Sequence, residues 1–392
     1  MQDVFILSGQ RTAIGDFGKS LKDIPPTKLG EIAIRAAIAQ SGAEAAEIQN
    51  VVMGTVIYTE PRDTYLSRVS SLDAGVLVGT PAMNVNRLCG SGLQAIISAA
   101  QGIMLGDSSL AVAGGAESMS RGGYLLPSGR WGARLGDGQI IDMVVGTLND
   151  PFGGGHMGIT AETVASRYGL TREVQDAFAV ESHRRAALAI AEGRFKSQIT
   201  PVELASRKGV TLFETDEHPR IETSMESLGG LKPAFQKGGT VTPGNASSLN
   251  DGAAAVVLAS GAEVARRNAK PLARLVSYGH AGVEPGVMGL GPIPASQIAL
   301  KKAGLTIADI DVIEANEAFA AQACAVARDL GFPPEKVNPN GGAVALGHPV
   351  GASGAIITIK ALYELQRTQS RYALVTMCIG GGQGIAAIFE RV

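Results

Sequence analysis

Of the three cysteines in the chain, Cys89 has the local sequence most suited to chemistry. It lies in residues 86–92, Asn-Arg-Leu-Cys-Gly-Ser-Gly, immediately before an apolar stretch that predicts a helix. The open N–H groups and partial positive charge of a helix start stabilise a thiolate. Because only about 3% of free cysteine is ionised at pH 7, such a position raises the fraction that can act as a nucleophile. The alternative is a small buried thiol that packs at the start of the helix.

His348 lies in residues 346–351, Leu-Gly-His-Pro-Val-Gly, and also precedes a predicted helix. An imidazole placed beside Cys89 can accept the thiol proton and hold the thiolate, as in nucleophilic catalysis by cysteine. Taken alone, a histidine before a proline is more often a turn residue whose hydrogen bonds are satisfied. Its function therefore depends on which residues the fold brings beside it.

Cys378 follows the strand-like residues 373–377 and precedes a run of glycines that begins at Gly380. Glycines let backbone N–H groups approach a ligand oxygen closely, as an oxyanion hole requires. A second thiol at such a loop can act as an acid or a base. The alternative is a buried cysteine at a strand end. Cys324 lies among alanines in a predicted helix, where we expect it to pack in the core.

Asn316 follows strand-like residues 312–313, at the carboxyl end of a strand, where α/β proteins usually form their sites. Its amide carries both donors and an acceptor, so it can hold a water molecule or a carbonyl oxygen. The alternative is that it caps the helix predicted after Phe319.

Short sequence matches recur at a constant offset of 262 positions. Residues 46–48 return as 308–310, Ser91-Gly92 returns as Ser353-Gly354, and the strand-like residues 110–113 return as 372–375. A constant offset predicts two copies of one α/β pattern. It also places Cys89 and His348 at corresponding loop-to-helix junctions, which can face a shared cleft.

These copies divide the chain into three parts. The second half covers residues 271–392, the first half covers 1–120 plus 250–270, and an inserted block covers 121–249. The insertion is the more solvated part, because residues 121–240 contain 28 charged residues and residues 271–392 contain 18. It includes a helix predicted over residues 171–192 with Thr171 as its cap.

The strands alternate with helices, which predicts an α/β fold with packed, largely parallel sheets. The glycine cluster at residues 380–384 lies between two strand-like runs. A dinucleotide-binding fingerprint needs a helix after its glycines, so a Rossmann domain is excluded.

The composition of the 392 residues excludes several classes of protein. A net charge of −2 without a run of like charges argues against a nucleic-acid partner. Three scattered cysteines match neither a disulfide framework nor a zinc motif, so we expect no metal. No uninterrupted apolar stretch reaches the roughly 18 residues of a membrane span, so we expect no membrane. The short apolar stretch at residues 4–7 lacks a preceding basic region, which predicts a core strand and a cytoplasmic protein.

Together, the motifs resemble the thiolase family over essentially the whole chain. Any one of them is weak evidence, whereas eight in order are highly specific. The matching pieces are Asn86-Arg87-Leu88-Cys89-Gly90-Ser91-Gly92, Gly114-Gly115-Ala116-Glu117-Ser118-Met119-Ser120, His156-Met157-Gly158, Gly244-Asn245-Ala246-Ser247, Asn250-Asp251-Gly252-Ala253, Asn316-Glu317-Ala318-Phe319, Gly347-His348-Pro349 and Cys378-Ile379-Gly380-Gly381-Gly382.

The resemblance implies a layered αβαβα core of two pseudo-symmetric halves with an inserted loop domain that covers the coenzyme A site. It implies an acetyl-CoA C-acetyltransferase, which reversibly condenses two acetyl-CoA to acetoacetyl-CoA plus CoA, or cleaves short 3-ketoacyl-CoA. Cys89 then becomes acylated, while His348 activates it and, with a water held by Asn316, stabilises the enolate oxygen. Cys378 moves the α-proton, and the N–H groups of Cys89 and Gly380 form a second oxyanion hole.

The resemblance also implies where coenzyme A thioesters bind, as substrates rather than as a permanently bound cofactor. It places Arg220 near the adenine end and Ser247 near the pantetheine amides. A homotetramer is implied, with residues 124–142 as a candidate assembly loop. The implied binding residues are Leu148, His156, Met157, Arg220, Ser227, Leu231, Phe235, Ala246, Ser247, Met288, Ala318 and Phe319.

Preferred chain length stays open at this point. The His156-Met157 pair resembles the acetoacetyl-CoA type, and much of the sequence also resembles bacterial β-ketothiolases that accept longer 3-ketoacyl chains. Pro243 replaces a usual alanine, and three glycines at residues 153–155 replace bulkier residues before His156. Both departures lie beside the implied acyl pocket.

Two rival functions fit part of this pattern. A ketoacyl-synthase-like condensing enzyme shares the fold type and the nucleophilic cysteine, but it has no second catalytic cysteine, so Cys378 opposes it. A catalytically silent acyl-CoA-binding or redox-sensing protein is opposed by the retention of both thiols and His348. The physiological direction, the pathway and any regulation are left open by the sequence.

Overall fold

The computed structural model describes residues 2–207 and 209–392. In the first part of the chain, strands and helices alternate as the hydrophobic pattern predicts. The elements are β1 (Val4–Arg11), β2 (Gly15–Asp16), α1 (Pro26–Ser41), β3 (Asn50–Gly54), α2 (Leu66–Asp73), β4 (Ala82–Val85), α3 (Ser91–Leu105) and β5 (Leu110–Ser118).

The last part of the chain repeats this alternation. Strand β14 begins 262 positions after β3, and strand β15 begins 262 positions after β5. This is the offset of the sequence matches. The elements are β12 (Asn250–Ser260), α8 (Gly261–Arg267), β13 (Ala273–Gly282), α9 (Pro292–Ala303), β14 (Val312–Ala315), α10 (Ala320–Leu330), α11 (Ala343–Leu346), α12 (Val350–Thr368), β15 (Tyr372–Ile379) and β16 (Gln383–Glu390).

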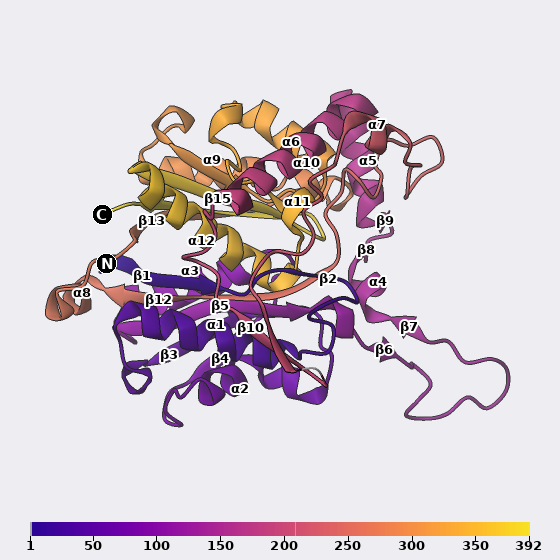
Figure 1. Cartoon of the computed structure of the whole chain (residues 1–392). Helices are drawn as coiled ribbons and strands as arrows, with labels where there is room; N and C mark the ends of the chain where they lie inside the picture. The colour runs from indigo at the N-terminus through magenta and orange to yellow at the C-terminus, as the bar shows by residue number, and fades with distance from the viewer. Residues whose placement is uncertain (1, 208) are drawn as a thin grey trace.

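The two copies build one layered core. Their strands form a sheet in the order β14-β15-β16-β13-β1-β12-β5-β3-β4, and β1 joins β13 where the halves meet. Helices α3 and α12 lie between the two halves of the sheet, with α1 and α2 outside one half and α9 and α10 outside the other (Figure 1). The expected αβαβα layering of two similar halves is therefore confirmed.

The expectation of largely parallel sheets is wrong. Among the strands of this sheet in the described residues, parallel pairs are β3 with β4, β3 with β5, and β14 with β15, whereas β1, β12, β13 and β16 pair antiparallel with their neighbours. One reason is the short connection between β15 and β16, in which Gly381 and Gly382 have φ of 79° and 87°. Such a turn is too short for the crossover that parallel strands need.

The central helices approach each other through glycines. A Cβ on Gly354 of α12 would lie 2.3 Å from the backbone N of Leu93, and one on Gly92 of α3 would lie 2.7 Å from Ala355 N. The serine-glycine pair of the repeat therefore marks the contact between the halves. The window Leu88–Leu105 is apolar and long enough to cross a membrane by composition, but α3 packs against α12 inside the core. Its hydropathy is that of a core helix.

The inserted residues lie between β5 and β12 in the sequence, and these two strands are antiparallel neighbours in the sheet. Thr171 caps α6 through a bond from Val174 N, as predicted. The three-part division at residues 120, 250 and 270 remains a prediction. The inserted elements are β6 (Tyr124–Leu125), β7 (Ile141–Asp142), α4 (Met143–Thr147), β8 (Asn149–Asp150), β9 (Gly155–His156), α5 (Met157–Tyr168), α6 (Arg172–Ala191), β10 (Val202–Ser206), β11 (Gly209–Phe213) and α7 (Met225–Gly229).

Candidate active site

Cys89 lies in a tight turn between β4 and α3, two residues before the helix begins. The preceding residue, Leu88, has a φ of 46°, a left-handed conformation that is uncommon for a residue with a side chain. Ser91 holds this turn, because its Oγ accepts from Arg87 N at 2.9 Å and donates to Leu88 O at 2.7 Å. The fold thus places the thiol at a helix N-terminus, as the sequence predicts.

Burial raises the pKa of the Cys89 thiol above its ordinary value, and the charge of Glu117 raises it further. The N–H groups of Gly380 and of Cys89 itself act in the opposite direction. The expectation that the helix start makes this thiol more ionised than a free cysteine is therefore wrong. Removal of water raises the pKa of the thiol more than the backbone N–H groups lower it. A neutral thiol needs a base before it can act as a nucleophile.

His348 provides an imidazole at the start of α12. It is 6% exposed, and its backbone N donates to Asn250 Oδ1 at 2.8 Å. The preceding Gly347 has a φ of 103°, and a Cβ there would lie 2.4 Å from Asn250 Cγ. A glycine is therefore required for this loop to pass Asn250 and present the ring.

The hydrogen bonds of Ser353 assign the tautomer of His348. Ser353 Oγ lies 2.9 Å from Pro349 O, which takes its single hydrogen. Its lone pair then accepts from His348 Nδ1 at 2.6 Å, which leaves Nε2 unprotonated. Burial lowers the pKa of His348 to about 4, so the ring is neutral at pH 7. His348 can therefore serve as a base through Nε2.

Asn316 follows β14, and its backbone N donates to Thr376 O at 3.0 Å on the neighbouring strand β15. Its Nδ2 lies 3.5 Å from His348 Nε2. The side chain does not cap a helix, because α10 begins at Ala320 with Phe319 as its N-cap residue. The next residue, Glu317, is buried and accepts from Ser182 Oγ at 2.6 Å and Asn338 Nδ2 at 2.8 Å. These contacts anchor the loop that carries Asn316.

Cys378 lies near the end of β15 and is completely buried. Burial raises the pKa of its thiol, and the charge of Cys89 raises it further, so Cys378 is protonated in the free protein and becomes a strong base when ionised. Gly380 begins the turn that follows. Cys324 is half-buried on α10, where burial raises the pKa of its thiol to about 12.

One cavity of about 410 Å³ brings most of the predicted residues together. Cys89, His348, Cys378 and Gly380 all line it, although they come from separate parts of the chain. Ser227 lies outside it on the exposed helix α7, and Leu231 packs beside Leu228. The remaining predicted binding residues line the same cavity: Leu148, His156, Met157, Arg220, Phe235, Ala246, Ser247, Met288, Ala318 and Phe319.

Aromatic rings form one wall of this cavity. His156 stacks on Phe235 with ring centroids 4.7 Å apart, and Phe235 meets Phe319 edge-on at 6.1 Å. A Cβ on Gly158 would lie 2.2 Å from Phe235 Cγ, so the glycine at the start of α5 admits the ring. The resulting apolar slot suits a flexible, uncharged chain.

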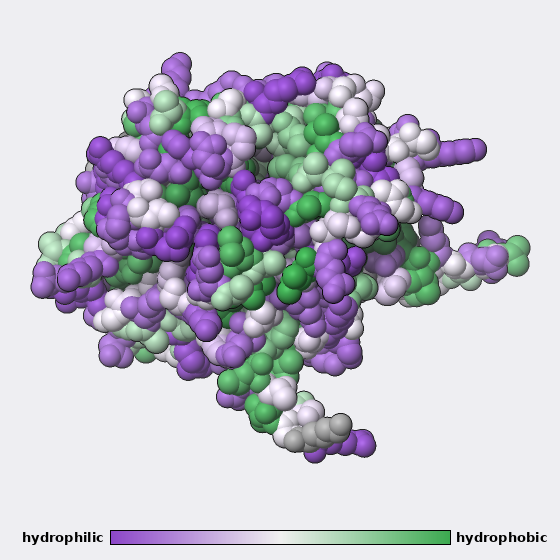
Figure 2. Space-filling model, turned by 45° about the horizontal axis from the view of Figure 1, so that its top comes forward, coloured by the Kyte–Doolittle hydropathy of each residue, from purple (hydrophilic) through white to green (hydrophobic). Residues whose placement is uncertain are grey.

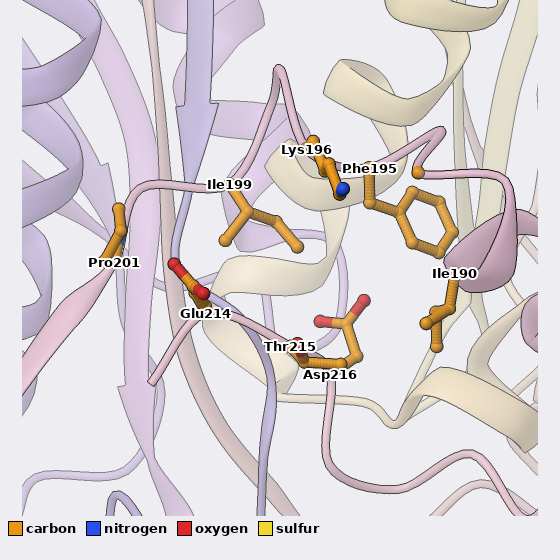
Figure 3. A pocket seen from close by; sticks show the side chains of 9 residues that line it. Ile190, Phe195, Lys196, Ile199, Pro201, Glu214, Thr215 and Asp216 are labelled. Carbon is orange, nitrogen blue, oxygen red and sulfur yellow. The ribbon is translucent and has the colours of Figure 1, made fainter. Parts of the chain in front are cut away.

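A second cavity, of about 520 Å³, lies between the end of α6 and the segment after β11 (Figure 3). Lys196 and Glu214 are among its lining residues, while Asp216 is bound by Arg11 through contacts of 2.7 and 2.9 Å. None of the predicted site residues lines it. Across the described ranges, no group of three or more histidine, cysteine, aspartate or glutamate side chains is placed to hold a metal ion.

Comparison with known proteins identifies the family. The family model described as "Thiolase, N-terminal domain" matches residues 4–262, and the one described as "Thiolase, C-terminal domain" matches residues 269–391. The chain belongs to the thiolase family. This thiolase is 60% identical over 392 residues to the "Beta-ketothiolase BktB" of Cupriavidus necator, with 100% of each chain covered. It is 49% identical over 393 residues to an acetyl-CoA acetyltransferase of Pseudomonas aeruginosa, again with 100% of each chain covered.

Solved structures agree with this assignment. An acetyl-CoA acetyltransferase of Bacillus anthracis matches the thiolase with a TM-score of 0.98 and 43% identity, covering 100% of this chain and 99% of the other. Human mitochondrial 3-ketoacyl-CoA thiolase in complex with CoA matches with a TM-score of 0.96 and 41% identity, covering 100% and 98%. The resemblance and the fold class inferred from the sequence are thereby confirmed.

Sequence reasoning missed the residues that orient His348. Ser353 and Asn250 each bond His348, and neither was assigned a role. A signal for Ser353 was present, because Ser353-Gly354 is the repeat of Ser91-Gly92 and Ser91 follows Cys89 closely. Asn250 lies within a matching motif but almost 100 positions from His348, so local spacing offers no link between them.

Proposed function

We propose that this thiolase is an acetyl-CoA C-acetyltransferase, which joins two acetyl-CoA into acetoacetyl-CoA and free CoA, or runs the reverse cleavage with short 3-ketoacyl-CoA. The observation that carries the proposal is the convergence of Cys89, His348, Cys378 and Gly380 on one cavity. The full-length identity to relatives named beta-ketothiolase and acetyl-CoA acetyltransferase supports it. Coenzyme A thioesters serve as substrates, and the proposal needs no permanently bound cofactor.

The first half-reaction acylates Cys89. His348 Nε2 accepts the thiol proton, and Cys89 Sγ attacks the thioester carbonyl of acetyl-CoA. The N–H groups of Cys89 and Gly380 face the reacting sulfur and stabilise the oxyanion. When the tetrahedral intermediate collapses, the carbon–sulfur bond to CoA breaks and the leaving thiolate takes the proton from His348. The products are acetyl-Cys89 and free CoA.

The second half-reaction forms the carbon–carbon bond. Cys378 gives its own proton to His348 Nε2 and then removes the α-proton of a second acetyl-CoA. The protonated His348, with a water held by Asn316, stabilises the resulting enolate oxygen. The enolate carbon attacks the acetyl group and expels Cys89 as a thiolate, which takes the proton back from His348. Acetoacetyl-CoA leaves, with Cys378 protonated again.

The coenzyme would lie along the cavity, partly against the inserted residues. Arg220 is at its mouth, where its backbone N donates to His183 Nδ1 at 3.2 Å, and it would meet the adenine end. Ser247 would bond the pantetheine amides. Ser227 and Leu231 are proposed to contact the coenzyme outside the cavity itself. The other eight binding residues named above would line the pantetheine and acyl channel.

A preference for longer 3-ketoacyl-CoA is the alternative form of the same function. The high identity to a relative named beta-ketothiolase supports it, as does the loop at residues 150–155, in which Gly153 and Gly155 have φ of 89° and 75°. This loop leads directly into His156 on the cavity wall. Measuring kcat/KM across a series of 3-ketoacyl-CoA of increasing length distinguishes the two forms.

The first experiment mixes the purified protein with acetyl-CoA, follows release of CoA, and maps any acetyl-sized mass gain by peptide mass spectrometry. Acetylation on Cys89 that added CoA reverses supports the proposal. Cys378→Ser should still be acetylated but should fail in condensation, and His348→Ala should be impaired in both steps. Absence of both adduct and exchange in the wild type would contradict the proposed function.

We also propose a cytoplasmic homotetramer. The segment between β6 and β7 extends well away from the body (Figure 1), and Trp131 and Leu135 on it are 88% and 97% exposed. In the space-filling view the same projection carries hydrophobic side chains beside hydrophilic ones (Figure 2). Apolar groups exposed in this way are typical of an assembly surface. Sedimentation that shows only monomer would reject the tetramer.

A further inference from the structure

A buried ion pair lies behind the active site and takes no part in the reaction described above. Lys360 of α12 and Glu314 of β14 are each 1% exposed in their side chains, and Lys360 Nζ lies 2.8 Å from Glu314 Oε2. Lys360 Nζ also donates to Gly341 O at 2.6 Å. An ammonium has three hydrogens, so one is left after these two bonds. A buried pair is costly to desolvate and is weak evidence for a purely stabilising role.

Lys360 lines a small cavity together with residues that belong to the site or support it. Its volume is about 10 Å³, which is room for about one water molecule. Lys360 and Asn316 both line it, and Ser353, which bonds His348, lines it as well. The polar groups that a bound water requires are therefore present around a space of suitable size.

Asn316 offers an acceptor for a water in this cavity. Its side chain is 2% exposed, and its Oδ1 has no hydrogen-bond partner among the residues that the structure describes. Leaving a buried amide oxygen without a partner is unfavourable. Its Nδ2, in contrast, faces His348 Nε2 at 3.5 Å. The amide nitrogen of Asn316 therefore faces His348, whereas the amide oxygen has no donor among the described residues.

We propose that Lys360 is a positioning residue for Asn316, acting through one water molecule bound in this cavity. The water accepts the third hydrogen of the ammonium and donates to Asn316 Oδ1. This bond holds the amide with its two hydrogens toward the active site, where the enolate oxygen is stabilised. A reversed amide would present its oxygen to the developing negative charge and repel it. The inference rests on the proposed function of Asn316.

The experiment compares the two half-reactions in Lys360→Met, which keeps the length of the side chain and removes its hydrogens. Acetylation of Cys89 by acetyl-CoA does not use Asn316, so its rate should stay within about twofold of wild type. Condensation from the acetylated enzyme should fall about tenfold or more, because an amide that is no longer held in place weakens the stabilisation of the enolate, and loss of one such donor costs about 10²-fold or more. Ile359→Val, at the neighbouring buried position of α12, controls for a small loss of packing and should leave the ratio of the two rates unchanged.

A second variant separates the water contact from the ion pair. Glu314→Gln removes the charge partner but keeps the ammonium, so the ratio of condensation to acetylation should fall less than in Lys360→Met. A high-resolution crystal structure of the wild type should show one water within hydrogen-bond distance of Lys360 Nζ and Asn316 Oδ1. An equal fall of both half-reactions in Lys360→Met, equal ratios in the two variants, or a cavity without that water would overturn the inference. Failure of the wild type to acetylate Cys89 would instead overturn the proposed function.

Discussion

Ser91 and Ser353 occupy the same position in the two halves of the fold, and each holds the loop that carries a reactive side chain. Ser91 Oγ bonds Arg87 N and Leu88 O in the turn that presents Cys89. Ser353 Oγ lies 2.6 Å from His348 Nδ1. One serine of the repeated pair therefore holds the turn of the proposed nucleophile, and the other sets the proton position of the proposed base.

Replacing Ser353 with alanine should slow the enzyme without unfolding it. Without the hydroxyl, the N–H at His348 Nδ1 loses its acceptor, so the tautomer with its proton on Nε2 becomes populated. That tautomer cannot accept a proton at Nε2. General-base catalysis is worth about 10²-fold or more, so we expect acetylation of Cys89 to slow by about tenfold to a hundredfold.

The matched control is Thr358→Val on the same helix. Thr358 is buried like Ser353, and in the part of the chain that the structure describes its Oγ1 donates to Gly354 O at 2.7 Å and has no contact with His348. The acetylation rate of the Thr358→Val variant should remain near that of the wild type. Equal rates for Ser353→Ala and the wild type in stopped-flow acetylation would show that Ser353 does not fix the tautomer.

Gly354→Ala should destabilise the protein, because the added methyl group would lie 2.3 Å from the backbone of Leu93 in the neighbouring helix. Backbone cannot move aside as a flexible side chain can, and overpacking of this kind costs about 1–3 kcal/mol or more. On α3 itself, Gly102 is a suitable control, since a Cβ there meets nothing closer than 3.8 Å. Gly102→Ala should be neutral or slightly stabilising, because alanine favours helix. Thermal unfolding of the two variants decides between these expectations.

The rate of Cys89 acetylation should change little as the pH falls from 7 to about 5. Burial lowers the pKa of His348 to about 4, so the ring remains a neutral base as pH falls from 7 and becomes protonated only when pH passes through about 4. A histidine with its ordinary pKa would lose half of its base form near pH 6.5. Initial rates between about pH 5 and 8 measure this, and a decline centred near pH 6.5 would be inconsistent with a buried base.

Phe235→Ala should raise KM for acetyl-CoA with little change in kcat. The ring stacks on His156 and meets Phe319 edge-on, so it forms the channel wall rather than contacting the reacting atoms. A contact made equally in the ground state and the transition state changes KM alone, and loss of a buried aromatic contact should increase it about tenfold. Phe17, 50% exposed and outside the cavity, offers a control through Phe17→Ala. A fall in kcat at constant KM would assign Phe235 a part in the chemistry instead.

The sequence by itself determined the family and the repeat, and it gave the prediction of which groups react. Those conclusions depend on local strings of residues, such as the glycines after Cys378, and on spacing along the chain, such as the offset that relates Ser91 to Ser353. It also predicted the strands and helices, because hydrophobic periodicity and caps such as Thr171 are local properties.

Only the tertiary structure decided strand direction, ionisation and the supporting contacts. Parallel and antiparallel pairs bury similar residues, so periodicity does not distinguish them. The pKa of Cys89 depends on how much water the fold removes, which outweighs the helix start that the sequence showed. The bonds from His348 to Asn250, and the cavity shared by Asn316 and Lys360, join residues distant in the chain. Such pairings exist only once the two halves pack, because no local signal records which surfaces will meet.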